Sequence, residues 1–403
     1  MKRTITIILA LTMLLSLASC GTGGSPDQSP APTGKENADP AVDLRCSFAT
    51  IISEQMLDVG NTIYYLCEGE RMQLVYFTDK TNRGWMPLCG RPDCMHKYPD
   101  CCAYIDGGGD SFKIWAYGEH IYYIVLKSAL IDTAPELWRM RLDGTEHEKL
   151  LQCSDDGLSG KYMDLQWDWL FHGRYAILTL VGRNSPDGAE ASCAYFVIDL
   201  GADEPVQRRL GFEGYSALGY SVAGEGDILY GLTYPESGGA VVLRVDLKNG
   251  TSDELCTLPF VPGIYCCDII GDRLYFCDGS STGMIASVKT ADGGMTLMDN
   301  RLPVGANYTI HGEYIISTTA LSQSGSPGTR IYSLDGTLIN EIPYEACGAD
   351  ITVTRAVGGL AFGVENLYDD PYAVYLFPPE WYLDLDEIGT EGFGWHRWSP
   401  DGE

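Results

Sequence analysis

The sequence predicts an all-β fold, a β-propeller of seven blades with four antiparallel strands in each. Three observations lead to this prediction. A hairpin-like segment recurs seven times, a second pair of strand-like segments follows each copy, and amphipathic helical patterns are almost absent. The alternative is a six-bladed propeller in which the weakest unit, near residues 350–388, is an appendage.

Each of the seven hairpin-like segments has an apolar strand, a tight turn usually built around glycine, and a second strand rich in Tyr and Ile or Leu. Residues 115–125, WAYGEHIYYIV, are a typical copy. Glycine supplies the positive φ that two-residue hairpin turns require. We expect these segments to form the two inner strands of each blade. They lie at 57–66, 115–125, 170–180, 223–232, 269–277, 309–317 and 356–364.

A second strand pair follows each hairpin and is expected to form the two outer strands. The clear copies alternate apolar and polar residues around DG or NG, which are strong hairpin turn signals. These copies lie at 137–151, 241–258 and 329–342, and weaker ones lie at 73–88, 193–210, 284–298 and 372–385.

With these repeats the chain resembles the propeller lipoproteins of unknown function found in anaerobic Firmicutes, and more loosely the TolB-like and WD40-like propellers. The resemblance covers roughly residues 45 to 390. It implies a fold and does not imply an activity. The tail also contains WSPDG (residues 398–402), which resembles the turn motif of TolB-type repeats. We expect Trp395 and Trp398 of this tail to pack against the last blade.

The strand order predicts two unlike ends of the propeller. If the strands of a blade are called a to d from the centre outward, the a–b and c–d turns share one end and are mostly short. The b–c and d–a connections share the other end and are longer. Binding residues concentrate on loops held by a rigid scaffold, so we expect ligand contacts at this second end. The candidate residues there, beside His96, are Tyr98, Tyr104, Asp106, Asp110, Tyr234, Tyr368, Asp369 and Asp370.

The N-terminus carries an export signal. Lys2 and Arg3 precede an apolar run that is too short to span a bilayer and ends in LASC. This ending resembles the lipobox of bacterial lipoproteins, which implies lipidation of Cys20 and anchoring outside the cytoplasm. An ordinary secreted protein is the alternative. We therefore expect a signal peptide at 1–19, the lipidated cysteine with a flexible Gly/Ser/Pro-rich tether at 20–43, the propeller at 44–390 and a tail at 391–403.

The charge balance restricts the partners. The formal net charge is −28 at pH 7, and so acidic a chain repels phosphate backbones. We expect no nucleic-acid partner. The expected partners are the membrane, through the lipid on Cys20, and a glycan, peptide or envelope protein.

A dense cysteine cluster lies in PLCGRPDCMHKYPDCCAY, residues 87–104. Its spacing is C-x4-C-x-H-x4-C-C. Disulfides are the default use of clustered cysteines in an exported protein, and they are the preferred interpretation. A structural zinc ion is the second interpretation, and free thiols or a catalytic thiol complete the alternatives. In the zinc interpretation the ligands are Cys89, Cys94, His96 and Cys101. Cys101 and Cys102 are too close for an unstrained disulfide with each other, so we expect at least one of them to pair elsewhere.

A second cysteine pair is suggested by the hairpin at 269–277. If Gly271 and Asp272 form its two-residue turn, Cys266 lies opposite Cys277, where a cross-strand disulfide could form. Without Cys20 the chain has thirteen cysteines. This odd number leaves at least one cysteine unpaired in a monomer.

No catalytic constellation stands out. The only G-x-S-x-G pattern, around Ser281, joins two predicted strands, whereas a nucleophile elbow leads from a strand into a helix. His120, His172 and His311 fall at the a–b turns and are expected to face solvent, so only His96 has chemically relevant neighbours. A binding or scaffold module is therefore the preferred function, and we expect no cofactor beyond the zinc alternative. An extracytoplasmic hydrolase or lyase acting on polysaccharide or peptide is the alternative.

Overall fold

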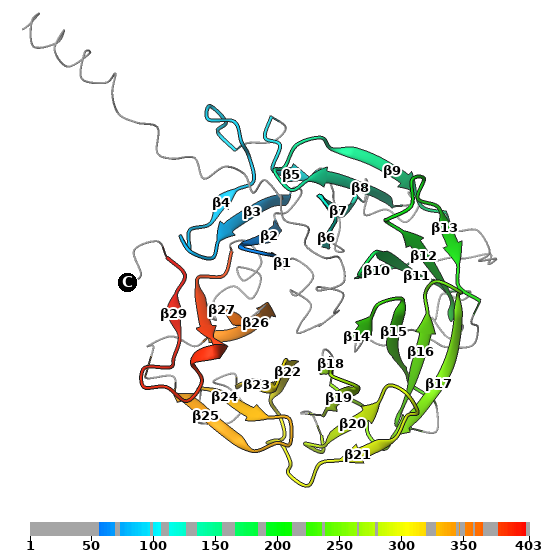
Figure 1. Ribbon diagram of the computed structural model, residues 1–403, viewed down its shortest axis with the longest axis vertical. Coiled ribbons are helices and arrows are strands. Elements are labelled where there is room, and N and C mark those ends of the chain that lie inside the picture. Colours follow the sequence, from blue (N-terminus) through cyan, green and yellow to red (C-terminus); the bar gives the residue numbers. More distant parts are fainter. Residues whose placement is uncertain are drawn as a thin grey trace, which may run out of the picture. The chain divides into compact units, whose positions relative to one another are not determined.

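The computed structural model describes seven antiparallel sheets arranged in a ring (Figure 1). The described residues are 56–68, 73–96, 100–105, 113–125, 135–154, 166–183, 191–211, 223–235, 238–263, 266–278, 281–319, 328–343, 346, 351–357, 359–365 and 378–399. Within these residues the only helical element of three or more residues is a 3-10 turn, η4 (Leu385–Glu387). The prediction of an all-β seven-bladed propeller is confirmed, and the six-bladed alternative is wrong.

Each blade takes four strands in chain order from the centre outward, and the sheet of blade 1 has a fifth strand, β5 (Tyr104–Ile105), which pairs with β3. The first four blades are β1 (Met56–Val59), β2 (Thr62–Glu68), β3 (Gln73–Asp79) and β4 (Met86–Pro87); β6 (Ile114–Tyr117), β7 (His120–Val125), β8 (Glu136–Arg141) and β9 (Glu148–Gln152); β10 (Gln166–His172), β11 (Tyr175–Arg183), β12 (Ala191–Asp199) and β13 (Gln207–Arg209); and β14 (Ala223–Glu225), β15 (Ile228–Thr233), β16 (Ala240–Asp246) and β17 (Thr251–Leu258). The last three are β18 (Cys267–Ile270), β19 (Arg273–Cys277), β20 (Ile285–Lys289) and β21 (Met295–Leu297); β22 (Asn307–His311), β23 (Tyr314–Thr319), β24 (Gly328–Ser333) and β25 (Leu338–Pro343); and β26 (Ile351–Val357), β27 (Leu360–Glu365), β28 (Trp381–Asp384) and β29 (His396–Arg397).

The seven expected inner hairpins are all present, and each a–b turn has two residues between its strands. In the six turns whose first residue is described, that residue is a glycine with φ between 53° and 62°. This left-handed conformation matches the twist of the flanking strands and is unfavourable for residues with a Cβ atom. The recurrent glycine therefore sets the register of the two inner strands.

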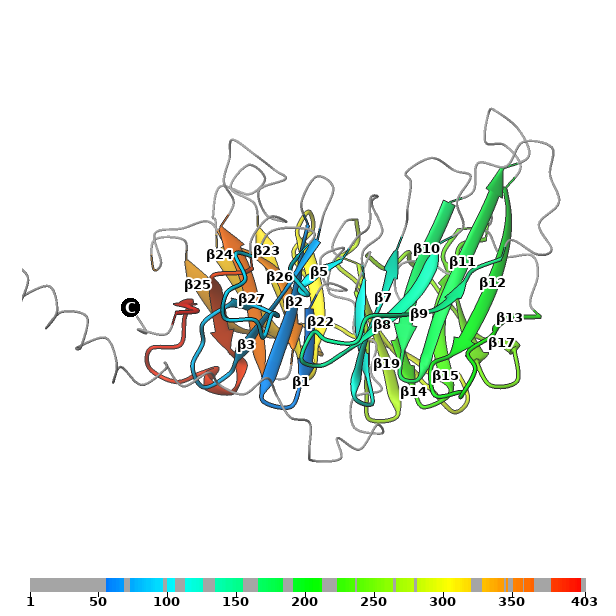
Figure 2. The ribbon, with the colours of Figure 1, turned by 90° about the horizontal axis from the view of Figure 1, so that it is seen from above.

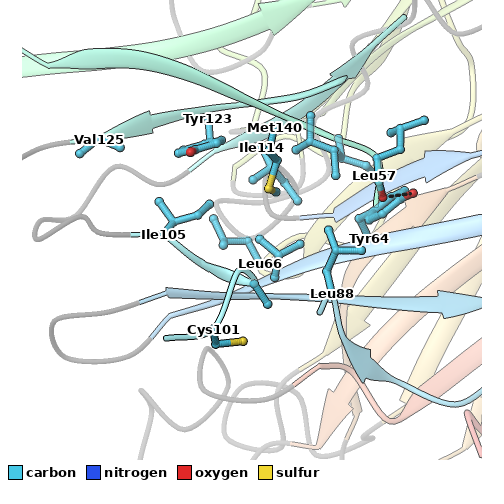
Figure 3. Close-up of a cluster of buried hydrophobic side chains, with 14 residues drawn as sticks. Leu57, Tyr64, Leu66, Leu88, Cys101, Ile105, Ile114, Tyr123, Val125 and Met140 are labelled. Carbon is cyan, nitrogen blue, oxygen red and sulfur yellow. Dashed lines mark hydrogen bonds between the residues drawn. The ribbon is translucent and has the colours of Figure 1, made fainter. Parts of the chain in front are cut away.

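Apolar side chains on the faces of the blades form seven buried clusters, one between each pair of neighbouring blades. Figure 3 shows the cluster between blades 1 and 2, where Leu57, Tyr64 and Leu66 meet Ile114 and Tyr123. The Tyr64 hydroxyl donates to a main-chain carbonyl of blade 2 at 3.0 Å. Because these clusters run around the whole ring, the core lies between the blades.

The ring closes between blade 7 and blade 1, where β26 lies against β1. Among the described residues no strand is exchanged between these two blades. The joint is made by side chains. The Trp398 indole donates to Thr78 Oγ1 at 3.1 Å, and its ring lies edge-on to Phe362 and Tyr382. The Arg83 guanidinium stacks 4.7 Å from the centroid of the Tyr382 ring and also bonds its hydroxyl.

The C-terminal segment enters the fold more deeply than expected. We expected both outer strands of blade 7 at 372–385, but the third strand is β28 (Trp381–Asp384) and the fourth is β29 (His396–Arg397). β29 lies in the segment that we assigned to a tail. Trp395 and Trp398 flank β29 and are buried, which confirms their expected packing. Their burial at the two sides of blade 7 draws this segment back along β28.

The antiparallel strands separate the connections as expected. The a–b and c–d turns leave one end of the blades, where the β1–β2 turn lies at the lower edge of Figure 2, and the b–c and d–a connections leave the other. We call the second the loop end. No helix among the described residues has the length and apolar character needed to cross a bilayer.

Packing between blades 4 and 5 gives a stability prediction. Gly293, in the turn between β20 and β21, has φ +73°, and an added Cβ would lie 2.1 Å from the carbonyl oxygen of Leu255 in blade 4. Gly271 has a similar φ, +62°, with open space around it. We expect Gly271→Ala to cost about 1–2 kcal/mol for the backbone conformation alone. Gly293→Ala should cost about 1–3 kcal/mol more because of overpacking. Urea denaturation of both variants measures the difference, and equal losses would contradict the described contact.

Candidate metal centre

The cysteine cluster lies in a loop that is anchored at both ends to one strand of blade 1. The loop leaves after β4 (Met86–Pro87) and returns at β5 (Tyr104–Ile105), and both of these strands pair with β3. The Leu88 amide donates to the carbonyl of Val75 at 2.8 Å, and the Val75 amide donates to the carbonyl of Ala103 at 2.9 Å. One residue of β3 therefore fixes both ends of the loop, which we call the cysteine loop (residues 88–103).

The cysteine loop brings four potential metal ligands together. These are Cys89, Cys94, His96 and Cys101, whose donor atoms all lie within 4.8 Å of one another. The Cys101 sulfur lies 3.6 Å from His96 Nδ1. Zinc bonds of about 2.3 Å to sulfur and about 2.0 Å to nitrogen, in a tetrahedron, place the donors about 3.5–3.8 Å apart. The set named from the sequence as the zinc alternative is thus assembled in space at close to the required separation.

Main-chain amides of the loop point at three of these sulfur atoms. The amide of His96 donates to Cys94 Sγ at 3.4 Å. The amides of Arg91 and Ala103 donate in the same way to the sulfurs of Cys89 and Cys101. In all three cases the donor follows the cysteine by two residues. Amide donors stabilise negative charge on sulfur, so the loop is arranged to hold thiolates.

Positive charge accompanies these sulfurs. The Arg91 guanidinium donates to Cys94 Sγ at 3.3 Å and also to the carbonyl of Asp100. This side chain therefore crosses the loop and ties its first half to its second.

The thiols of the loop differ in acidity. Burial opposes ionisation of Cys89, but hydrogen bonds from the Arg91 amide and from the thiols of Cys102, Cys94 and Cys101 outweigh it and lower its pKa to about 6. Burial, together with hydrogen bonds to neighbouring thiols, raises the pKa of Cys101 to about 12 and that of Cys102 to about 11. Cys89 is therefore a thiolate at neutral pH, and the neighbouring thiols donate hydrogen bonds to it.

His96 has an unusual backbone. Its φ is +51°, a left-handed conformation that costs a residue with a Cβ about 1–2 kcal/mol. In this conformation its amide reaches the Cys94 sulfur while its ring nitrogen faces the Cys101 sulfur. Two ligands separated by one residue can thus point into the same site.

Hydrogen bonds of His147, outside the group of four ligands, connect the cysteine loop to blade 2. His147, in the turn between β8 and β9, donates from Nε2 to the carbonyl of Cys102 at 2.9 Å. Its Nδ1 accepts from the Tyr123 hydroxyl at 2.7 Å. The Cys102 thiol bonds the carbonyl of Leu88 at 3.8 Å and stands outside the group of four. Nothing local in the sequence indicates the His147 contact, because it joins positions 45 residues apart in two blades.

The second cysteine pair has the expected alignment. The Cys277 amide donates to the carbonyl of Cys266 at 3.2 Å, which confirms that the two residues lie opposite each other. Both are buried, and the Cys266 thiol donates to the carbonyl of Tyr308 at 3.1 Å. A hydrogen bond with Cys266, together with burial, raises the pKa of Cys277. A disulfide between them stays a prediction.

The remaining candidate residues are only partly described. Tyr234 follows β15 at the loop end and is 38% exposed, as a ligand-contacting residue requires. Tyr104 is half-buried in β5 and packs on the cluster between blades 1 and 2. The other candidates, Cys20, Tyr98, Asp106, Asp110, Tyr368, Asp369 and Asp370, lie outside the described residues.

Ser281 has the structural role expected for it. Its hydroxyl donates to the Asp278 carboxylate at 2.8 Å, and Thr282 donates to the same carboxylate through its amide and its hydroxyl. Asp278 is fully buried and organises the connection between β19 and β20. Ser281 and Thr282 therefore lie in a turn between two strands that is capped by Asp278.

Comparison with known proteins finds only distant structural similarity. No known family and no curated protein matches the sequence. Similar solved structures include TolB from Acinetobacter baumannii, with 14% identity, a TM-score of 0.37 and coverage of 71% of this chain and 64% of TolB. A puromycin-hydrolyzing peptidase of Mycobacterium tuberculosis has 14% identity, a TM-score of 0.44 and coverage of 89% and 55%. A chain of the mitotic checkpoint complex has 14% identity, a TM-score of 0.45 and coverage of 79% and 87%.

The chain thus spans less than two thirds of the length of TolB and of the peptidase. TolB-like and WD40-like propellers are among its structural neighbours. At this level of similarity the neighbours carry no inference about activity.

Proposed function

We propose that this protein is a lipid-anchored extracytoplasmic β-propeller that binds a glycan, peptide or envelope protein through its loop end. The observation that supports the proposal is the inequality of the two ends. At one end the a–b turns have two residues each and the c–d turns have four to eleven, the longest being 385–395, whereas the other end carries connections as long as 126–135 and 366–380. Long loops on a rigid scaffold are the usual place for recognition.

The described part of the loop end has suitable chemistry. Tyr234 presents an aromatic ring, on which a sugar or a side chain can stack. The cysteine loop follows the fourth strand of blade 1 and contacts the turn between β8 and β9 of blade 2. The signal segment and Cys20 add the expectation of a membrane anchor.

Amide hydrogen exchange, compared between the two ends of the blades with and without ligand, tests this proposal. The ectodomain, residues 21–403, is screened against a panel of envelope glycans and peptides for binding and for turnover. For any ligand that binds, we expect slower exchange in the b–c and d–a connections and unchanged exchange at the seven a–b turns. Protection confined to the a–b turns would contradict the proposal. Turnover of a panel member would instead support the hydrolase or lyase alternative.

A further inference from the structure

We propose that Cys89, Cys94, His96 and Cys101 bind one Zn²⁺ ion, and that this ion holds the cysteine loop against blades 1 and 2. Three thiolates and one imidazole are the ligand type of structural zinc sites. The inference does not depend on the proposed binding function, because it concerns the internal chemistry of one loop.

The arrangement fits a metal better than a disulfide. A disulfide would join two of the three sulfurs at about 2.05 Å. It would not account for the third sulfur and the imidazole lying beside that bond. Instead all four donors converge within 4.8 Å. The left-handed backbone of His96 is explained if its ring must reach the same ion as the Cys94 sulfur.

The hydrogen bonds around the sulfurs also suit a metal site. Each of the three sulfurs accepts a main-chain amide from two residues further along. Three thiolates and Zn²⁺ carry a net charge of −1, and the Arg91 guanidinium beside Cys94 supplies the compensating charge. The metal binds all three sulfurs as thiolates, so metal–sulfur bonds replace whatever S–H bonds are present and their protons pass to solvent.

The site has the features of a closed, structural centre. Four protein ligands complete a tetrahedron and leave no position for water or substrate. Cys101 is buried in the cluster between blades 1 and 2, as Figure 3 shows at the edge of that cluster. The fifth sulfur nearby, that of Cys102, is hydrogen-bonded to the carbonyl of Leu88 and to Cys89, and it lies outside the group of four. The ion would therefore stabilise the loop and would not catalyse a reaction.

The outer hydrogen bonds predict where the ion acts. The carbonyl of Cys102, next to the ligand Cys101, accepts from His147, which in turn accepts from Tyr123. A metal that fixes Cys101 thus also fixes the contact with the turn between β8 and β9. We expect removal of the ion to speed hydrogen exchange in that turn as well as in the cysteine loop.

The experiment uses the ectodomain, residues 21–403, purified under reducing conditions with no added metal. Elemental analysis should find one zinc per chain. Cys94→Ser and His96→Asn should lower the bound zinc at least tenfold, whereas the matched control Cys102→Ser should keep one equivalent. Replacement of zinc by Co²⁺ in the parent protein should give the visible and near-ultraviolet absorption bands of a tetrahedral thiolate site, which tests the ligand set without relying on the folding of a variant.

Two results would overturn the inference. One is absence of stoichiometric zinc in the reduced parent protein together with failure to take up Co²⁺. The other is full zinc retention in both Cys94→Ser and His96→Asn. Neither result bears on ligand binding at the loop end, so failure of the zinc site and failure of the proposed function can be told apart.

Discussion

Trp398→Ala is expected to lower the free energy of unfolding by about 3–5 kcal/mol, the usual cost of truncating a buried tryptophan. Trp398 is buried between blades 7 and 1, where its ring lies 5.0 Å from Phe362 and 5.2 Å from Tyr382 between centroids. Its loss also leaves Thr78 Oγ1, which is buried, without the indole donor. Because no described strand crosses this joint, side-chain packing holds the ring closed. Urea denaturation measures the loss.

Trp395→Ala is the matched control for this change. Trp395 is also buried and donates to a threonine hydroxyl, Thr329 Oγ1, at 3.1 Å, but it packs in the cluster between blades 6 and 7. Both variants should lose stability. Only Trp398→Ala should speed hydrogen exchange in β1 and β2 of blade 1 under native conditions. If both variants open the same blades, the ring joint is not the weak point that the packing indicates.

Acidification from pH 7 to pH 4 is expected to remove about 3 kcal/mol of stability through His172 alone. His172 is fully buried between blades 3 and 4, and its Nε2 donates to the carbonyl of Gly226 at 2.9 Å. Burial lowers the pKa of His172 to about 4, despite the opposing effects of this carbonyl and of Asp227. The folded protein therefore holds a neutral ring.

The pH range follows from the two protonation states. Above pH 6.5 the ring is neutral in both folded and unfolded chains, and its contribution is complete. As the pH falls from about 6.5 to about 4, the unfolded chain gains a proton that the folded chain excludes, so stability is lost. Comparison of parent and His172→Gln by urea denaturation at pH 7.5 and at pH 4 isolates this loss. An equal pH dependence in both proteins would contradict it.

The blade structure could be predicted because its signals are local. Two-residue turns with glycine, alternating side chains and recurring DG turns each act within about ten residues, and together they specify antiparallel hairpins. Repetition of the unit then requires a closed array, since each blade buries its faces only against neighbours. The alignment of Cys266 with Cys277 followed from counting back from one such turn.

Features that depend on contacts between blades were missed. We expected His172 to face solvent because it lies beside an a–b turn, and this was wrong. Gly224 of blade 4 leaves the space that its ring occupies, since a Cβ there would lie 2.4 Å from the ring. The strand β29 was likewise missed because it is short and is held by the burial of Trp395 and Trp398.

The cysteine loop could be predicted only in part. Its ligand types were evident from the sequence, but their spacing matches no common zinc motif, so disulfides were preferred. Convergence of the four donors depends on the left-handed backbone of His96 and on the anchoring of both loop ends to Val75. Neither feature has a signature in the sequence, because bulky residues rarely adopt positive φ.

We claim above all that the cysteine loop is organised around one ion. Anomalous X-ray diffraction from crystals of residues 21–403, measured on both sides of the zinc absorption edge, tests this claim most directly. We predict a single strong peak about 2.3 Å from the sulfurs of Cys89, Cys94 and Cys101 and about 2.0 Å from a ring nitrogen of His96. Absence of a peak, with continuous density joining two of these sulfurs at about 2.05 Å, would contradict the claim and establish a disulfide in its place.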